Sequence, residues 1–228
     1  MVLEYFIDCL NSFEIKIMSY AVKEIFLTLQ GEGYFAGRTA VFCRFSGCNL
    51  WSGQEKDRAT AICQFCDTDF VGMDGSGGGR FEDANSLAIA IEKHWGERDT
   101  SYRFVVFTGG EPLLQLDKSL IDVLKKKGFF IAVETNGTML VPKGVDWICV
   151  SPKQGAALMQ MHGDELKLVY PQEAMNPQKF ESLSFKSFRL QPRDDEQRDK
   201  HLRQAIQYCQ DHPKWYLSLQ THKLIGIP

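Results

Sequence analysis

The feature that most constrains the fold is the alternation, from Met18 onward, of short apolar segments with amphipathic helical patterns. The apolar segments are rich in β-branched and aromatic residues, which are typical of strands. Because strands separated by helices usually pair in parallel, the pattern predicts an α/β fold with a mostly parallel sheet, either doubly wound or curved into a barrel. There are too few strand-helix units for a complete eight-unit barrel. The expected strands are 22–28, 40–45, 104–108, 129–134, 147–150, 166–170, 188–191 and 215–219.

Three segments have helical periodicity, namely 83–95, 116–127 and 195–212. In the last of these, Leu202, Ile206 and Cys209 are expected to form the buried face. With 228 residues and 44% apolar content, the chain is long enough for one well-buried domain. We expect this single domain to cover 18–228, preceded by an N-terminal extension, 1–17, whose status as native sequence the pattern leaves open.

Charge and hydropathy exclude several classes of protein. The formal net charge is -3, so the chain lacks the basic excess with which proteins bind nucleic acid phosphates. No stretch approaches the ~18 to 20 apolar residues of a membrane-spanning helix, and no export signal is visible. We therefore expect a cytoplasmic protein without nucleic acid or membrane partners. In that compartment the seven cysteines are expected to be metal ligands or buried thiols rather than disulfides.

Cys48, Cys63 and Cys66 form a Cys-x14-Cys-x2-Cys run. Three thiolates can bind three irons of a [4Fe-4S] cluster and leave the fourth iron open to a small molecule. The spacing also permits a four-cysteine zinc site that includes Cys43, or unrelated thiols. Cys43 falls within the expected strand 40–45, where a buried apolar thiol is the ordinary outcome. The spacing alone leaves these alternatives open.

Polar segments follow several of the expected strands. In parallel sheets, reactive groups lie just past the carboxyl ends of the strands, so these segments should meet at one mouth. A separate glycine-containing segment, 31–36, matches a loose dinucleotide-binding pattern, but another strand pattern follows it instead of a helix. A turn is therefore the better reading of 31–36. The polar segments expected at the mouth are 108–111, 134–137, 151–153 and 191–194.

Three cysteines after an early strand, Phe65 before the last cysteine, and Gly-Gly-Glu-Pro at 109–112 together resemble the radical S-adenosylmethionine superfamily. The usual spacing in that superfamily is Cys-x3-Cys-x2-Cys, from which the fourteen-residue gap departs. The gap and four further motifs resemble the 7-carboxy-7-deazaguanine synthase family in its long-loop form, over about Met18 to Pro228. The four motifs are Leu-Gln-Gly-Glu-Gly at 29–33, Arg-Phe-Ser-Gly-Cys-Asn-Leu-Trp at 44–51, Cys-Asp-Thr-Asp at 66–69 and Gln-Thr-His-Lys at 220–223.

The resemblance implies a partial (βα) barrel, a homodimer and a carbon-nitrogen lyase of queuosine biosynthesis. The implied reaction converts 6-carboxy-5,6,7,8-tetrahydropterin to 7-carboxy-7-deazaguanine by hydrogen abstraction at C6, radical ring contraction, return of the hydrogen and loss of ammonia. Its implied cofactors are a [4Fe-4S] cluster, S-adenosylmethionine and Mg²⁺, with flavodoxin or ferredoxin as electron donor. Other superfamily members, such as glycyl-radical activases, and a non-catalytic zinc module are the alternatives.

The resemblance also implies which residues form the site. Cys48, Cys63 and Cys66 would hold the cluster, and Thr68 would bind Mg²⁺, although chemistry alone would choose Asp67 or Asp69 because Mg²⁺ prefers charged oxygen. No side chain is identified as a general acid or base. The implied S-adenosylmethionine site consists of Gly110, Glu134, Ser151, Pro152, Lys153, Gln191, Pro192, Arg193 and Asp194. The implied substrate site consists of Leu29, Gln30, Gly31, Glu32, Arg44, Thr108, His222 and the terminal residue Pro228.

Overall fold

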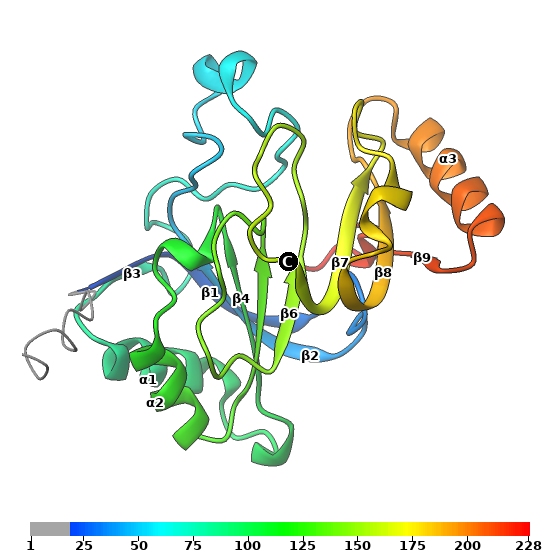
Figure 1. Ribbon diagram of the computed structural model, residues 1–228. Helices are drawn as coiled ribbons and strands as arrows, with labels where there is room; N and C mark the ends of the chain where they lie inside the picture. Colours follow the sequence, from blue (N-terminus) through cyan, green and yellow to red (C-terminus); the bar gives the residue numbers. More distant parts are fainter. Residues whose placement is uncertain (1–18) are drawn as a thin grey trace, which may run out of the picture.

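The computed structural model describes residues 19–228, so the expected N-terminal extension lies outside the described residues (Figure 1). Within 19–228, nine strands form a single sheet in the order β3-β1-β2-β4-β5-β6-β7-β8-β9. Their bounds are β1 (Tyr20–Leu29), β2 (Thr39–Phe45), β3 (Gly79–Phe81), β4 (Phe104–Gly109), β5 (Phe130–Thr135), β6 (Trp147–Val150), β7 (His162–Tyr170), β8 (Ser184–Pro192) and β9 (Trp215–Leu217).

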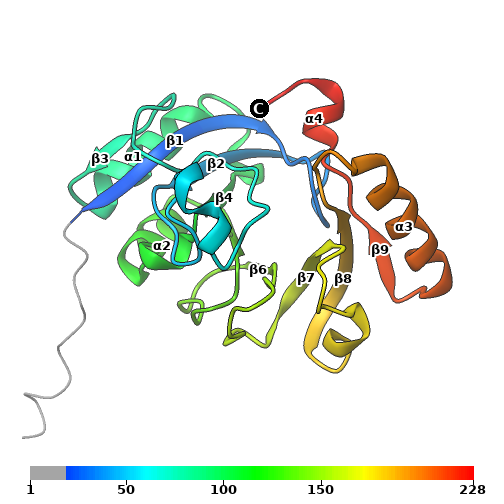
Figure 2. The ribbon, with the colours of Figure 1, turned by 90° about the horizontal axis from the view of Figure 1, so that it is seen from above.

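The sheet is mostly parallel and it is not closed. Every neighbouring pair from β2 to β9 is parallel, whereas β1 is antiparallel to both β2 and β3. Seen from above, the strands follow a curve with the helices outside it (Figure 2). The chain therefore forms a partial (βα) barrel. This confirms the expected α/β class and shows that the sheet is curved as a barrel and not doubly wound.

Helices α1 (Ala84–Trp95) and α2 (Lys118–Lys126) cover one half of the outer face, and α3 (Arg198–Asp211) covers the other (Figures 1 and 2). Asp83 begins α1 with a capping box, and Asp117 begins α2 by accepting a hydrogen bond from the Leu120 amide. A short helix, α4 (Thr221–Ile225), follows β9. Within 19–228, none of the helices combines the length and apolarity that crossing a bilayer would require.

The apolar core lies in two parts between the sheet and these helices. The larger part packs α1 and α2 on the strands at the β1 side, with Leu87, Ile91 and Leu120 fully buried. The smaller part packs α3 on β7 and β8 through Leu166 and Leu190 among others. Burial of each such side chain stabilises the fold by about 1.5 to 3 kcal/mol. With the apolar residues on the outer face of the sheet, the inner face is left for polar groups.

The expected strands are all present, with ends that differ by a few residues. The expected buried face of α3 is only partly present: Cys209 packs against the smaller core part and Leu202 is half-buried, but Ile206 is exposed. The fully buried residues of this helix are His201 and Ala205. Elements that the sequence analysis missed are short: β3, α4 and four 3-10 helices, Glu55–Thr60, Thr100–Tyr102, Pro112–Leu114 and Pro177–Phe180.

The turn between β1 and β2 forms the floor of the barrel. Tyr34 and Phe35 pack on Trp147, each with ring centroids 4.7 Å apart, and Phe35 also contacts Phe104 at 5.2 Å. The chain then enters β2 directly, without a helix that could receive a pyrophosphate. The dinucleotide alternative for 31–36 is therefore excluded, and the opposite end of the barrel is the open one.

Gly109 fixes the register between β2 and β4, where it pairs with Phe45. Its φ is +143°, and a Cβ at this position would lie 2.3 Å from the Phe45 carbonyl oxygen and 2.8 Å from the Phe45 nitrogen. Both are backbone atoms held by strand pairing, so they cannot move aside. This contact requires glycine for strand packing.

The substitution Gly109→Ala should therefore lower the free energy of unfolding by about 3 kcal/mol or more. Gly128→Ala is the matched control, because Gly128 also has a positive φ, +78°, but no heavy atom within 4 Å of its Cβ position. The control should cost only about 1 to 2 kcal/mol. Urea unfolding of the three proteins measures both values, and equal losses would contradict the packing argument.

Candidate active site

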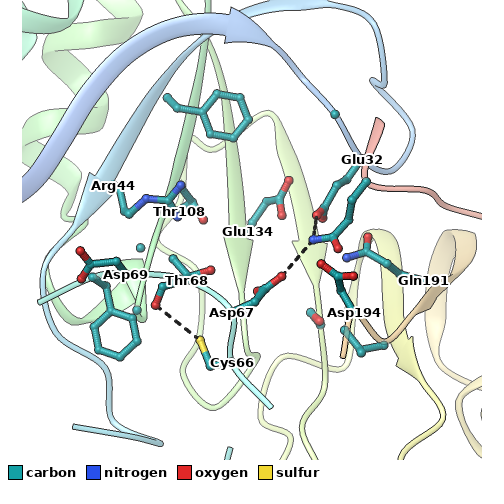
Figure 3. Close-up of a pocket in the computed structure, with 18 of the residues that line it drawn as sticks. Glu32, Arg44, Cys66, Asp67, Thr68, Asp69, Thr108, Glu134, Gln191 and Asp194 are labelled. Carbon is teal, nitrogen blue, oxygen red and sulfur yellow. Dashed lines mark hydrogen bonds between the residues drawn. The ribbon is translucent and has the colours of Figure 1, made fainter. Parts of the chain in front are cut away.

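A polar cavity of about 400 Å³ opens at the carboxyl ends of the strands. Residues from the cysteine loop, β1, β2, β4, β5, β8 and the C-terminal segment face it, and Figure 3 shows ten of them labelled around a common space. The mouth predicted from the sequence therefore exists. The predicted site residues that line it are Leu29, Gln30, Gly31, Glu32, Arg44, Cys48, Cys63, Cys66, Thr68, Thr108, Gly110, Glu134, Ser151, Lys153, Gln191, Pro192, Arg193, Asp194, His222 and Pro228.

Pro152 is the predicted site residue that the cavity does not include. It is buried, and its carbonyl oxygen accepts a hydrogen bond from Gln172 Nε2 at 3.3 Å. Its neighbours Ser151 and Lys153 face the cavity, and Lys153 Nζ donates to the Ser151 carbonyl oxygen at 2.6 Å and to Ser151 Oγ at 2.7 Å. Pro152 therefore supports the turn after β6 from behind.

The fourteen residues between Cys48 and Cys63 form a loop whose two ends are joined by hydrogen bonds. The Leu50 carbonyl oxygen accepts hydrogen bonds from the Ile62 amide at 3.1 Å and from the Cys63 amide at 3.3 Å. Within the loop, the Arg58 guanidinium lies 4.0 Å from the centroid of the Trp51 ring. Because the two ends of the loop are close together, all three cysteines line the same cavity in spite of the long gap between Cys48 and Cys63 in the sequence.

The environments of the three sulfurs differ: burial raises the pKa of Cys48, and the pKa of Cys63 also rises, whereas the pKa of Cys66 falls. The Leu50 amide donates to Cys48 Sγ at 3.4 Å. The interaction between the Cys63 and Cys66 side chains is the main reason why the pKa of Cys66 falls to about 6 and the pKa of Cys63 rises. The Lys153 ammonium stabilises negative charge on both sulfurs. Amide donors and a cation beside the sulfurs are features of iron-sulfur sites.

Cys43 lies apart from this group. It sits in β2, fully buried in the larger apolar core, and burial raises the pKa of its thiol. Among residues 19–228, no three Cys, His, Asp or Glu side chains are grouped so as to hold a single metal ion. The place of Cys43 in the core, outside the cavity that the other three cysteines line, speaks against the four-cysteine zinc site.

Glu111 of the Gly-Gly-Glu-Pro segment is buried behind the cavity and connects several segments by hydrogen bonds. Its carboxylate accepts hydrogen bonds from the Leu113 amide at 3.0 Å, from Thr135 Oγ1 at 2.7 Å and from the Asn136 amide at 2.8 Å. Its own amide donates to the Gly47 carbonyl oxygen at 2.9 Å. Glu111 thereby ties the ends of β4 and β5 to the start of the cysteine loop.

Gly110 is required for the same junction. A Cβ on Gly110 would lie 2.2 Å from the Gly47 carbonyl oxygen and 2.7 Å from the Cβ of Cys48. The missing side chain therefore lets the cysteine loop approach β4, whatever ligand the backbone also receives.

Arg44 projects from β2 into the cavity and forms an ion pair with Glu24 on the adjacent strand, with 2.7 Å between Arg44 Nε and Glu24 Oε1. The contact uses one edge of the guanidinium. Thr108 lies opposite Arg44 in the paired strand β4 and lines the same wall (Figure 3).

The two acids beside Thr68 already have cationic partners. Asp67 Oδ2 lies 2.6 Å from Lys223 Nζ, and Asp69 Oδ2 lies 2.8 Å from Lys23 Nζ. Thr68 faces the cavity between them.

The C-terminal segment reaches back to the end of β1. Thr221 donates to the Gly31 carbonyl oxygen through its amide at 2.9 Å and its hydroxyl at 2.8 Å, and Thr28 Oγ1 donates to the Pro228 carbonyl oxygen at 2.8 Å. A Cβ on Gly31 would lie 2.1 Å from His222 Nδ1, so glycine is needed for His222 to reach the cavity. These contacts hold the C-terminal segment against the end of β1 and the turn that follows it.

Sequence reasoning missed several charged groups of the cavity. Lys167 is the most buried of them, with 5% of its side chain exposed, and it pairs with Glu32 and Glu134. An isolated lysine inside the apolar run Leu-Lys-Leu-Val of β7 was the available signal. Lys23 and Lys223 gave no comparable signal because lysines are common at the ends of strands and on short helices.

Comparison with known proteins gave relatives over nearly the whole chain. A 7-carboxy-7-deazaguanine synthase of Bordetella pertussis is 61% identical over 92% of this chain and all of the relative, and one of Caulobacter vibrioides is 60% identical over the same shares. The crystal structure of QueE from Escherichia coli superposes with a TM-score of 0.68 at 28% identity, covering 90% of this chain and 95% of that one. A scan against protein-family models found no match.

The open sheet, the outer helices and the polar mouth define a partial (βα) barrel of the type found in radical S-adenosylmethionine enzymes. With relatives above 55% identity along their full length, the chain belongs to the 7-carboxy-7-deazaguanine synthase family.

The contribution of the Glu111 hydrogen bonds to stability can be tested by mutation. Glu111→Gln should lower the free energy of unfolding by about 1 to 3 kcal/mol, because one acceptor oxygen becomes an NH₂ group that faces another donor in a buried site. The exposed Glu97→Gln is the control and should stay within about 0.5 kcal/mol of the parent protein. Urea unfolding measures the difference, and an unchanged free energy of unfolding in Glu111→Gln would show that these hydrogen bonds are dispensable.

Proposed function

We propose that this chain is a 7-carboxy-7-deazaguanine synthase of queuosine biosynthesis. The proposed reaction contracts the ring of 6-carboxy-5,6,7,8-tetrahydropterin to 7-carboxy-7-deazaguanine with loss of ammonia, as a carbon-nitrogen lyase. The observation that carries the proposal is the 61% identity with a relative of that name along the relative's entire length. The cavity supports it, because it gathers polar groups from strands distant in the sequence.

For the cofactors, we propose that Cys48, Cys63 and Cys66 hold a [4Fe-4S] cluster. The amide donors, the nearby Lys153 and the common cavity wall fit three thiolate ligands and an open fourth iron. When bound, the cluster and S-adenosylmethionine would supply the radical chemistry for hydrogen abstraction from the pterin.

The remaining cavity residues would position the two organic molecules. The wall formed by Gly110, Glu134, Ser151, Lys153 and the segment 191–194 adjoins the cysteines and is the proposed site of S-adenosylmethionine. Glu134 offers a carboxylate to hydroxyl groups of the ligand. Gly110 has no side chain, so its backbone is accessible to an amine of the ligand.

The residues beside this wall suit a carboxylated pterin. Arg44 provides a cation for the substrate carboxylate, while Gln30, Glu32 and His222 provide hydrogen-bonding groups for its heterocycle. Leu29, Gly31, Thr108 and the terminal Pro228 complete this side.

Thr68 would bind Mg²⁺ together with the substrate carboxylate, which already supplies negative charge. We also propose a homodimer that receives electrons from flavodoxin or ferredoxin in the cytoplasm, with 18–228 as its single domain. The side chains bind, orient and shield the reacting groups, and none is assigned as an acid or base.

The direct test is turnover. Protein purified and reconstituted without oxygen, then reduced and incubated with S-adenosylmethionine, Mg²⁺ and 6-carboxy-5,6,7,8-tetrahydropterin, should yield 7-carboxy-7-deazaguanine and ammonia, measured by mass spectrometry and an ammonia assay. Formation of 5′-deoxyadenosine alone, without the deazaguanine, would refute the proposed substrate.

The cluster ligands are tested separately from turnover. Cys48→Ala, Cys63→Ala and Cys66→Ala should each lose the cluster, measured as iron, labile sulfide and visible absorbance, because a cube needs all three thiolates. Cys43→Ala is the matched control and should keep the cluster, since Cys43 is buried in the core. Cluster loss in Cys43→Ala, or one zinc without sulfide in the parent protein, would favour the four-cysteine zinc site.

A further inference from the structure

Four residues form a closed ring of hydrogen bonds in the interior of the barrel. Lys167 Nζ lies 2.7 Å from Glu134 Oε2 and 2.5 Å from Glu32 Oε2. Gln30 Nε2 donates to Glu134 Oε1 at 2.9 Å, and the Glu32 amide donates to Gln30 Oε1 at 3.1 Å. This Lys167 ring joins β5 and β7 to the turn that follows β1.

The ring contains two carboxylates and one ammonium group. Burial alone would lower the pKa of Lys167, but the attraction of Glu134 and Glu32 outweighs it and places the pKa well above the ordinary value. A third nearby carboxyl, Glu165, is buried, and burial raises its pKa. Glu165 bonds to the Tyr34 amide instead of to Lys167, so Lys167 is shared between two carboxylates alone.

Both carboxylates line the cavity and share the Lys167 ammonium group. Under the proposed function, Glu32 belongs to the pterin side and Glu134 to the S-adenosylmethionine side. Lys167 holds one oxygen of each, while Gln220 Nε2 and Gln30 Nε2 hold the other oxygen of Glu32 and Glu134 respectively. The orientation of either carboxylate therefore depends on the same ammonium group.

We propose that Lys167 is a positioning residue that couples the two ligand sites by holding Glu32 and Glu134 in their binding orientations. A ligand that hydrogen-bonds to Glu32 restrains its side chain, and Lys167 transmits that restraint to Glu134. A ligand bound to one carboxylate thus stabilises the whole ring, so the second ligand binds more tightly than it would alone. The inference rests on the proposed function, since it assigns the two ligands to the two carboxylates.

The test is a pair of binding titrations on the cluster-loaded protein. The dissociation constant of S-adenosylmethionine is measured with and without 6-carboxy-5,6,7,8-tetrahydropterin, and the reverse. We expect each ligand to tighten the other by about fivefold or more in the parent protein. In Lys167→Met, this mutual effect should disappear, and each ligand should bind about tenfold more weakly or worse.

Lys127→Met is the matched control. Lys127 also forms a tight ion pair, 2.6 Å from Glu92 Oε2, but on the outer face beside α1. It should leave both dissociation constants and their coupling unchanged. An intact coupling in Lys167→Met would overturn the proposal.

A double-mutant cycle separates positioning from a general loss of structure. If Lys167 acts through Glu134, the protein with both Lys167→Met and Glu134→Gln should bind S-adenosylmethionine about as weakly as Glu134→Gln alone. Weakening that is the product of the two single effects would show that Lys167 acts independently of Glu134. The same cycle with Glu32→Gln, measured on the dissociation constant of the pterin, tests whether Lys167 also acts through Glu32.

Two further measurements keep the outcomes distinct. The Lys167–Glu134 cycle is repeated on the thermal unfolding of the ligand-free chain, where an interaction between the two residues should appear even if the pterin proves to be the wrong substrate. If Lys167→Met does not fold, Lys167→Arg takes its place, because it keeps the charge but alters the reach. The ligand coupling should then fall, and an unchanged coupling would count against the proposal.

Discussion

The parallel pairing of the strands from β2 to β9 is the constraint on which the rest of the structure depends. Parallel strands bring their carboxyl ends to one edge, and the curvature of the sheet turns that edge into a mouth. Residues as distant in sequence as Arg44 and Gln191 therefore line one cavity. The outer face takes the apolar residues and the helices, which leaves the inner face free for charge.

Charge inside a barrel is stable only where it is paired, and this requirement shapes the cavity. Lys167 lies between Glu32 and Glu134, Arg44 pairs with Glu24, and the acids beside Thr68 pair with lysines. At the back of the cavity, Glu111 accepts three hydrogen bonds and ties the cysteine loop to β4 and β5. The same contacts that stabilise these groups also hold them in fixed directions, as ligand binding needs.

Much of this arrangement could be predicted from local pattern. The strands are strongly apolar and the polar segments follow them, so the expected α/β sheet and its mouth are both present. On α3 the expectation was wrong for Ile206, because Ala205 and not Ile206 is buried in the smaller core part. Lys167 was missed because a lysine gives no sign in sequence of the two carboxylates that lie near it only after folding. The short 3-10 helices and α4 were missed because so few residues carry no periodicity.

The sequence by itself determined the fold class, through the spacing of apolar residues, and the family, through its cysteine spacing and short motifs. Both are local properties, written in neighbouring residues. Only the tertiary structure decided that Cys43 belongs to the core, that Gly109 and Gly110 serve strand packing, and that one ammonium group joins two carboxylates. Those facts depend on which distant segments meet, and that is set by the pairing and curvature of the whole sheet.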